Sequence, residues 1–178
     1  STLTAITLSS LASPFSSGYF YDRGSEEIKR DQLMLPLKDG QIQIFSTGEN
    51  PCQLISTLDA KATCICLCKF KSKKCFVFGT TAGDLLFYEY KTLSFLSRVV
   101  LVPFTIIKVY YSGSFEENDV DDSLCLVYKD RVMRYSINDE KLYEAVIING
   151  SDVSISFNGL MIFGYDNGEI GSVYFDKN

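Results

Sequence analysis

The sequence predicts an all-β fold built from repeated four-stranded units. Three observations predict it: strand-forming aromatic residues are abundant, turn signals recur at regular intervals, and each turn lies between two short apolar segments. The 178 residues include 11 Tyr and 13 Phe, and aromatic and β-branched residues favour strands. With 46% hydrophobic and 22% charged residues, the composition is that of a folded domain rather than a disordered chain.

Four turn signals mark the repeat. They are Asp39-Gly40, Ala82-Gly83, Lys129-Asp130 and Asn167-Gly168. Each lies between two apolar segments, which is the pattern of a hairpin closed by a turn that tolerates positive φ. Their spacing of roughly 40–45 residues is typical of the blades of a β-propeller.

Each unit is expected to contain four strands. The strand before the hairpin is expected at residues 3–8, 63–70, 106–111 and 153–157. The two hairpin strands are expected at residues 33–35 and 41–45, 75–78 and 84–88, 124–127 and 131–135, and 160–163 and 169–173. A last strand follows at residues 53–58, 95–101 and 142–148. The expected blades are therefore residues 1–59 with an insertion at 13–31, 60–102, 103–150 and an incomplete 151–178.

The hairpin sequences resemble those of WD40 repeats. Residues 76–88 and 160–170 are similar to the hairpin between the second and third strands of such a repeat. The Trp-Asp pair that usually ends the third strand is replaced here by Phe45-Ser46, Tyr88-Glu89, Tyr135-Ser136 and Val173-Tyr174. The Gly-His pair that opens typical repeats is missing because the chain has no His. The resemblance covers nearly the whole chain, with degenerate repeats.

This resemblance implies a WD40-like β-propeller of about seven blades, of which the chain supplies about four. We expect the chain to be one part of a longer protein. The two alternatives are that a partner chain supplies the remaining blades, and that four blades close into a ring.

Composition argues against several functions. Without His, the chain lacks the commonest general base and metal ligand, and it cannot form a Ser-His-Asp or Cys-His catalytic site. The net charge of −5 disfavours direct binding to a nucleic-acid backbone. No apolar run is long enough for a membrane span. The Gly residues form no nucleotide-binding motif. We therefore expect no enzyme, no catalytic residue, no cofactor and no metal.

The six cysteines indicate a reduced intracellular protein. Cys64, Cys66 and Cys68 alternate along one segment, which places them on one face of a strand. A structural zinc site needs four converging ligands, usually in C-x-x-C pairs, and the chain has no such pair. Small buried side chains on the inner strand of a propeller are the favoured interpretation.

Three segments are candidates for partner contacts. The first is the expected insertion between residues 13 and 30, with its aromatic side chains; the second is a turn rich in lysine, which includes Lys69; the third is an acidic loop at residues 116–122. The candidate residues are Phe15, Tyr19, Phe20, Tyr21, Lys71, Lys73, Lys74, Glu116, Glu117, Asp119, Asp121 and Asp122. Simple solvated charge is the favoured interpretation of the lysine turn and the acidic loop, which should lie on the same rim of the propeller. For the insertion, the alternative to a partner contact is that its aromatic rings pack back over the edge of the blade.

The predicted function is a non-enzymatic protein–protein interaction scaffold in a eukaryotic multi-protein complex, with the nucleus preferred over the cytoplasm. The alternative is a module that recognises a peptide or modified tail at the channel mouth, near Asp84, Tyr165 and Asp166. A hydrolase that uses paired carboxylates is a third hypothesis. Its candidates are Asp39, Asp84, Asp130, Asp166 and Glu169, although Asp is also common in such turns.

Overall fold

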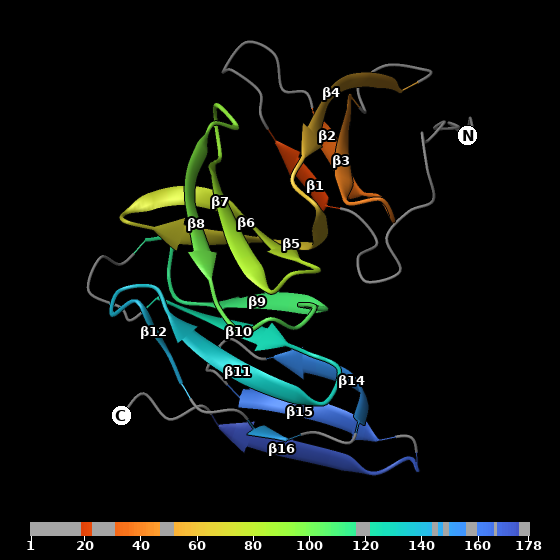
Figure 1. The fold of residues 1–178 in the computed structure, drawn as a ribbon, viewed down its shortest axis with the longest axis vertical. Coiled ribbons are helices and arrows are strands. Elements are labelled where there is room, and N and C mark those ends of the chain that lie inside the picture. Colours follow the sequence, from red (N-terminus) through yellow and green to blue (C-terminus); the bar gives the residue numbers. More distant parts are fainter. Residues whose placement is uncertain are drawn as a thin grey trace.

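The computed structural model describes residues 19–22, 31–46, 52–116, 122–143, 146–147, 150–155, 160–165 and 167–174. Within these ranges every regular element is a β-strand, and the strands form four antiparallel sheets in chain order (Figure 1). The prediction of an all-β fold is confirmed. Across the same ranges, we find no helix that is long and apolar enough to cross a membrane.

Consecutive antiparallel strands make up each sheet. The first sheet contains β1 (Tyr19–Asp22), β2 (Asp31–Pro36), β3 (Gln41–Ser46) and β4 (Gln53–Asp59). The second contains β5 (Ala62–Phe70), β6 (Lys73–Thr80), β7 (Asp84–Glu89) and β8 (Phe95–Val100). The third contains β9 (Lys108–Ser112), β10 (Ser123–Val127), β11 (Arg131–Ser136), β12 (Lys141–Leu142) and β13 (Val146–Ile147). The fourth contains β14 (Gly150–Ile155), β15 (Leu160–Tyr165) and β16 (Ile170–Tyr174).

The first strand of the first sheet differs from the prediction. Sequence analysis placed this strand at residues 3–8, which lie outside the described residues, and treated residues 13–31 as an insertion. In the structure β1 pairs with β2, with Tyr19 opposite Met34 and Tyr21 opposite Gln32. Tyr19, Phe20 and Tyr21 therefore belong to a strand rather than to a loop, because aromatic residues fit a pleated sheet surface well.

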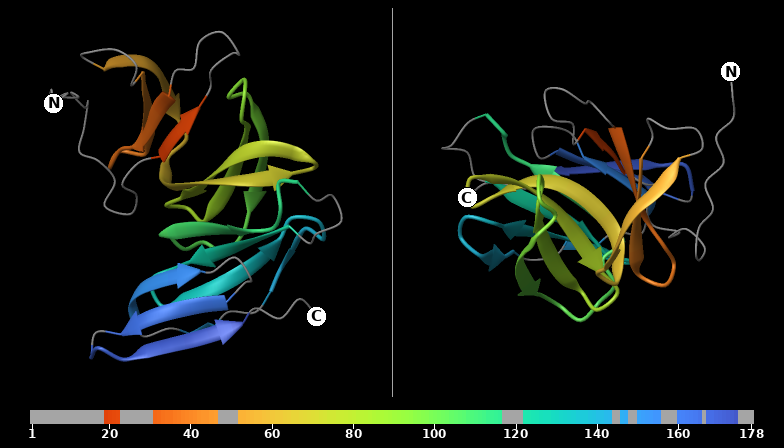
Figure 2. Two further views of the ribbon diagram at one scale, coloured as in Figure 1. Left: turned by 180° about the vertical axis from the view of Figure 1, so that it is seen from behind. Right: turned by 90° about the horizontal axis from the view of Figure 1, so that it is seen from above.

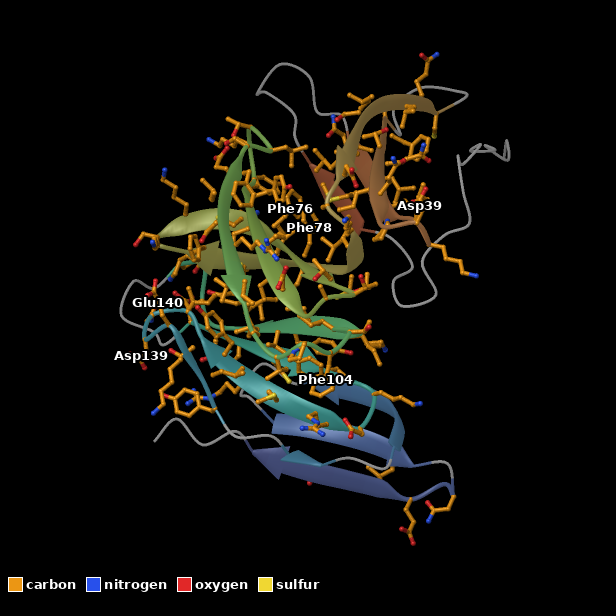
Figure 3. All side chains as sticks on the ribbon, viewed as in Figure 1. Asp39, Phe76, Phe78, Phe104, Asp139 and Glu140 are labelled. Atoms are coloured by element: carbon orange, nitrogen blue, oxygen red, sulfur yellow. The ribbon has the colours of Figure 1, made fainter. Side chains whose placement is uncertain are left out.

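The second sheet is packed on both faces. Leu85, Phe87 and Val77 point toward the third sheet, where they meet Leu124 and Leu126. On the opposite face, a second apolar cluster joins the second sheet to the first. Its buried members include Phe76, Phe78, Met34, Ile42 and Ile44 (Figure 3). Because a fully buried side chain of this size contributes about 1.5–3 kcal/mol, these two layers are the main source of cohesion between sheets.

The cysteine pattern on β5 follows the same division. Cys64 and Cys68 are buried in the layer that faces the third sheet, and Cys66 packs against that layer. Ile65 and Leu67 pack into the layer that faces the first sheet. The expected alternation of small and apolar side chains on this inner strand is therefore confirmed.

Glycine lies in three of the four hairpin turns that were predicted from the sequence. Gly40, Gly83 and Gly168 have φ values of 90°, 88° and 86°, which is the left-handed region that favours glycine. Lys129-Asp130 is different, because neither residue has a positive φ. That turn joins β10 to β11 without left-handed geometry, and its Tyr128 N–H donates to the Arg131 carbonyl at 2.8 Å.

The sheets follow one another along the longest axis of the molecule (Figures 1 and 2). The first sheet lies at one end and the fourth sheet at the other, so the described residues do not form a closed four-sheet ring. The inner strand β5 lies against β9 of the next sheet. There, Ile106 N–H donates to the Thr80 carbonyl at 3.1 Å, which links the second and third sheets through the backbone.

Candidate functional site

The turn between β5 and β6 is strained, and it displays lysine. Phe70 pairs with Lys73, so the hairpin closes through Lys71 and Ser72 alone. These two residues have φ values of 49° and 65°, which is the geometry of a type I′ turn. Asn and Gly are the usual residues at such positions, and a left-handed conformation costs other residues about 1–2 kcal/mol. Strained backbone of this kind is often found at functional sites.

Two lysines of this segment, Lys71 and Lys74, lie near aromatic rings. Lys74 Nζ lies 4.3 Å from the centre of the Tyr90 ring and 5.6 Å from that of Phe115. Lys71 Nζ lies 5.2 Å from the Phe70 ring centre. Phe115 is 48% exposed although it is a large apolar side chain. We call Lys71, Lys73, Lys74, Tyr90 and Phe115 the lysine–aromatic surface.

A shallow hollow adjoins this surface. Its volume is about 200 Å³, and it is lined by Phe70, Lys71, Lys73, Leu96 and Ser97. The floor is rigid, because Phe70 is buried and stacks on Phe87 at a ring-centre distance of 4.3 Å. The lining combines apolar residues with two lysines, which suits an apolar side chain that has a carboxylate beside it.

Lys69 differs from the other lysines of this segment. Its ammonium donates to the Ser114 carbonyl at 2.7 Å and lies 3.6 Å from Asp122 Oδ2. Asp122 in turn accepts a hydrogen bond from the Tyr111 hydroxyl. The prediction of four exposed lysines in one turn is therefore corrected: Lys69 is buried because an ion pair between neighbouring sheets needs it there.

Burial also changes the interpretation of Asp122. Its side chain is 7% exposed, and its two oxygens accept from Tyr111 and face Lys69. Burial and the Asp122 carboxylate raise the pKa of Tyr111 above its ordinary value, so this hydroxyl keeps its proton. Asp122 holds the second and third sheets together and is not accessible to a partner here.

The remaining candidates are distributed as follows. Glu116 is exposed and adjoins Phe115, whose ring lies near Lys74. That the acidic loop and the lysine turn share one rim remains a prediction, because residues 117–121 lie outside the described residues. Tyr19, Phe20 and Tyr21 belong to β1. Phe15, Glu117, Asp119 and Asp121 lie outside the described residues. The structure places Lys71, Lys73 and Lys74 in and directly after one turn, and Glu116 next to Phe115, whose ring Lys74 contacts. A contact of any of the candidates with a partner remains a prediction.

Three of the five candidate carboxylates, those of Asp39, Asp84 and Asp130, have a local structural partner. Asp39 Oδ1 accepts from the Gln41 amide at 3.0 Å. Asp84 is bound by Arg98, whose Nε lies 2.8 Å from Asp84 Oδ2. Asp130 accepts from Arg131, and this hydrogen bond lowers the pKa of Asp130. Asp166 is outside the described residues. These contacts match the turn-forming role that short acidic side chains commonly have.

The buried cysteines are unreactive by their environment. Burial raises the pKa of Cys64 and of Cys75 to about 11, and that of Cys66 to about 12. The pKa values of Cys68 and Cys125 are raised by the same cause. Among the described residues, we find no group of three or more His, Cys, Asp or Glu side chains placed to hold a metal ion.

Exposed apolar residues in β8 and directly after it were not among the sequence-based candidates. Phe95 on β8 is 55% exposed, Val100 at the end of β8 is 69% exposed, and Phe104 in the following loop is 50% exposed. The signal is present in the sequence of β8 and the residues after it. Phe95-Leu96 and Val99-Val100-Leu101 are apolar at consecutive positions, whereas a half-buried outer strand should alternate.

Solved structures share this fold. One is a humanized mutant of the Chaetomium thermophilum Polycomb Repressive Complex 2 bound to an inhibitor, with a TM-score of 0.65, 12% identity, and coverage of 95% of this chain and 40% of that chain. Another is BBS1N in complex with ARL6DN, with a TM-score of 0.57, 12% identity, and coverage of 89% and 48%. The RRP9 WD40 repeats give a TM-score of 0.54 at 10% identity, with coverage of 80% and 47%.

These similarities define the fold class: the chain has a WD40-like β-propeller fold. At 10–12% identity they establish the fold alone. No family model and no curated protein matches the sequence. The chain spans 40–48% of the length of the solved chains described above, which is about half of each.

Proposed function

We propose that this protein is a non-enzymatic scaffold for protein–protein interaction, and that the lysine–aromatic surface contacts a partner. The observation that carries the proposal is the exposure of large apolar and aromatic side chains next to lysines on a rigid sheet. Phe115 and Lys74 lie side by side there, above the turn that Lys71 and Ser72 strain. Aromatic side chains held rigidly at a surface are typical anchors of protein interfaces.

The electrostatics favour a partner segment that is acidic. Three exposed lysines, Lys71 in the turn and Lys73 and Lys74 at the start of β6, outnumber the one carboxylate that interacts with them electrostatically among the described residues, Glu89. A partner that brings a carboxylate to this turn and an apolar side chain to the adjoining hollow would fit both features. The similarity to a propeller-containing complex such as Polycomb Repressive Complex 2 supports a role inside a multi-protein assembly.

We also propose that further blades complete the propeller, from the same chain or from a partner. Support comes from the last sheet of the described residues. Ile162 and Ile170 are 40% and 77% exposed. Ile170 pairs with Gly164, which lies two residues from Ile162 along β15. Residues two apart in a strand, and residues paired directly across strands, lie on the same face, so both isoleucines lie on one face of the sheet. An additional sheet packed on this face would bury them, as the inner faces of the second sheet are buried.

The assignment to a eukaryotic intracellular complex, with the nucleus preferred, is part of the same proposal. A fluorescent fusion of the full protein tests the location. A nuclear signal supports the assignment, and secretion into the medium contradicts it.

Charge reversal tests the scaffold role. We would compare the tagged full protein with its Lys74→Glu variant and with Lys38→Glu, which reverses an exposed lysine in the turn between β2 and β3. The proposal predicts that a partner protein co-purifies with the wild type in stoichiometric amount. Lys74→Glu should reduce the amount of this partner that co-purifies about tenfold, since one lost charged contact costs about 1.4 kcal/mol or more. Lys38→Glu should retain it.

Phe115→Ala tests the contribution of the aromatic ring separately from that of the lysine charge, and it should also reduce the amount of partner that co-purifies. Circular dichroism would check that each variant is folded. Equal recovery with wild type, Lys74→Glu and Phe115→Ala would contradict the proposed surface.

A further inference from the structure

The outer strand β8 has an open edge. It pairs with β7 along its length, from Asp84 opposite Val100 to Tyr88 opposite Phe95. Within the described residues no strand pairs with the other edge of β8. An open edge presents unpaired N–H and C=O groups, and it is a template for another extended chain.

Natural edges carry lysine, proline, bulges or inward-pointing charges. Strand β8 has one of these features, a bulge at Leu96, because Phe87 pairs with Ser97 and Tyr88 with Phe95. It has no lysine and no proline. The one charged residue in β8 is Arg98, and Asp84 holds its guanidinium by hydrogen bonds from Nε at 2.8 Å and Nη2 at 2.5 Å. Apolar side chains dominate the remainder of the strand. Phe95, Leu96 and Val100 are all exposed.

A groove runs beside this edge. It has a volume of about 630 Å³ and lies between β8 with its following residues and the outer part of the third sheet. On one side it is lined by β8 and the residues that follow it, Ser97 to Val102, and on the other by Tyr135 of β11, Leu142 of β12 and Glu140 in the turn between them. Glu140 and its neighbour Asp139 lie in the turn between β11 and β12, close to the outer side of the molecule (Figure 3).

The smaller hollow adjoins Leu96 and Ser97 and is lined by Lys71 and Lys73, whereas the larger groove is lined by Glu140 and Arg98. Because Asp84 already pairs with the Arg98 guanidinium, Glu140 gives the larger groove its negative charge. An extended segment along β8 would therefore meet ammonium groups at one end and a carboxylate at the other. Between them it meets apolar walls that include Val99 and Leu142, which have contact with the core between the two sheets.

We propose that β8 binds an extended peptide segment of a partner protein as a fifth strand of the second sheet. The segment has apolar side chains at alternate positions, which enter the groove, and an acidic residue beside Lys71 and Lys73. Main-chain hydrogen bonds to β8 supply affinity, and the two hollows supply specificity. This inference rests on the proposed scaffold function and specifies how one partner segment is held.

The test uses a synthetic ten-residue peptide with Val at alternate positions, Thr between them and two Glu at one end. Binding to the full protein is measured by fluorescence anisotropy. Two further peptides carry N-methyl groups on alternate amides, one on the odd and one on the even positions. In an added strand one set of amides faces β8 and the other faces solvent.

The proposal predicts that one methylated peptide loses at least about tenfold in affinity while the other stays within about twofold, since each lost main-chain hydrogen bond costs about 1 kcal/mol. Replacing both Glu by Lys should weaken binding by a similar factor. Equal binding of the two methylated peptides would overturn strand addition. Equal binding of the Glu and Lys peptides would overturn the charge assignment.

Protein variants complete the test. Val100→Lys places a charge at an exposed position of the edge and should abolish peptide binding. Ile55→Lys makes the same change on β4, the outer strand of the first sheet, and should leave peptide binding intact.

Sedimentation of the protein alone tests the competing occupant, a second copy. A dimer that Val100→Lys dissociates would overturn the assignment to a partner peptide. If the peptides fail to bind but Lys74→Glu still releases the purified partner, the strand-addition proposal fails and the scaffold proposal stands.

Discussion

Lys69 and Asp122 form a buried ion pair between two neighbouring sheets. The Lys69 ammonium lies 3.6 Å from Asp122 Oδ2, and each side chain is 7% exposed. Lys69 belongs to β5, and Asp122 directly precedes β10. The pair is further fixed by the Ser114 carbonyl and the Tyr111 hydroxyl, so four residues from two sheets share one polar network.

Removing Lys69 should destabilise the fold strongly. Lys69→Met leaves the Asp122 carboxylate buried without its cation, and breaking a buried pair in this way costs about 3–5 kcal/mol. Urea denaturation followed by circular dichroism measures the loss. Lys71→Met is the matched control, because Lys71 is exposed, and it should change the free energy of unfolding by less than about 0.5 kcal/mol. Similar values for the two variants would contradict the role of Lys69.

Gly83 and Gly168 allow a matched test of packing at the turns. Both have nearly the same φ, 88° and 86°, so alanine introduces the same backbone strain at each. A Cβ at Gly83 would lie 1.9 Å from the Val102 carbonyl oxygen, whereas nothing lies within 4 Å of one at Gly168. Gly83→Ala should therefore lower the free energy of unfolding by about 2 kcal/mol more than Gly168→Ala. Equal thermal midpoints would show that the Gly83 turn is not packed as described.

Strain at the lysine turn predicts a stabilising substitution. Ser72 has a φ of 65° at the second position of a type I′ turn, where glycine is preferred. Ser72→Gly should stabilise the protein by about 0.5–1 kcal/mol, because it removes left-handed strain at some cost in unfolded-chain entropy. Ser72→Ala keeps the strain and should give no gain. A thermal midpoint for Ser72→Gly at or below that of Ser72→Ala would disprove the assignment.

The buried thiols predict a pH dependence. The pKa values of Cys64 and Cys75 rise from the ordinary value of 9.0 to about 11 in the folded protein. Below pH 9 the thiols are protonated in both the folded and the unfolded chain. Between pH 9 and about 11 the unfolded chain loses protons first, so stability falls as pH rises. Urea midpoints measured between pH 8 and 11 test this, and midpoints that increase over that range would contradict it.

The same burial controls chemical reactivity. Iodoacetamide reacts with thiolates, and at pH 8 Cys64, Cys68 and Cys75 remain thiols inside the core between the second and third sheets. They should be modified only after unfolding, as mass spectrometry of digested protein can show. Rapid modification of Cys68 in the native protein would contradict its burial.

Much of the fold was predictable because local patterns determine it. The turn glycines at Gly40, Gly83 and Gly168 and the apolar segments around them fix the hairpins without long-range information. The position of the first strand was not predictable in the same way. Tyr19–Asp22 has a strand-like sequence but lies in a segment that was expected to be an insertion, and its pairing with β2 is a tertiary contact.

The candidate site was predictable only where local sequence determines it. The lysine turn is visible in the sequence, but the burial of Lys69 depends on Asp122, which only the packing of two sheets brings near. The exposure of Phe95 and Val100 likewise depends on β8 being the outer strand of its sheet. Long-range packing of this kind cannot be deduced from one segment alone.

An experimental structure of the full protein tests the central claim most directly, namely that consecutive antiparallel sheets pack around an axis and leave their outer strands and turns for partners. We expect β5–β8 as one sheet with its faces against the first and third sheets, and a further sheet on the face that carries Ile170. Pairing of β8 with β9 in a continuous sheet, or Lys69 exposed and separated from Asp122, would contradict the claim.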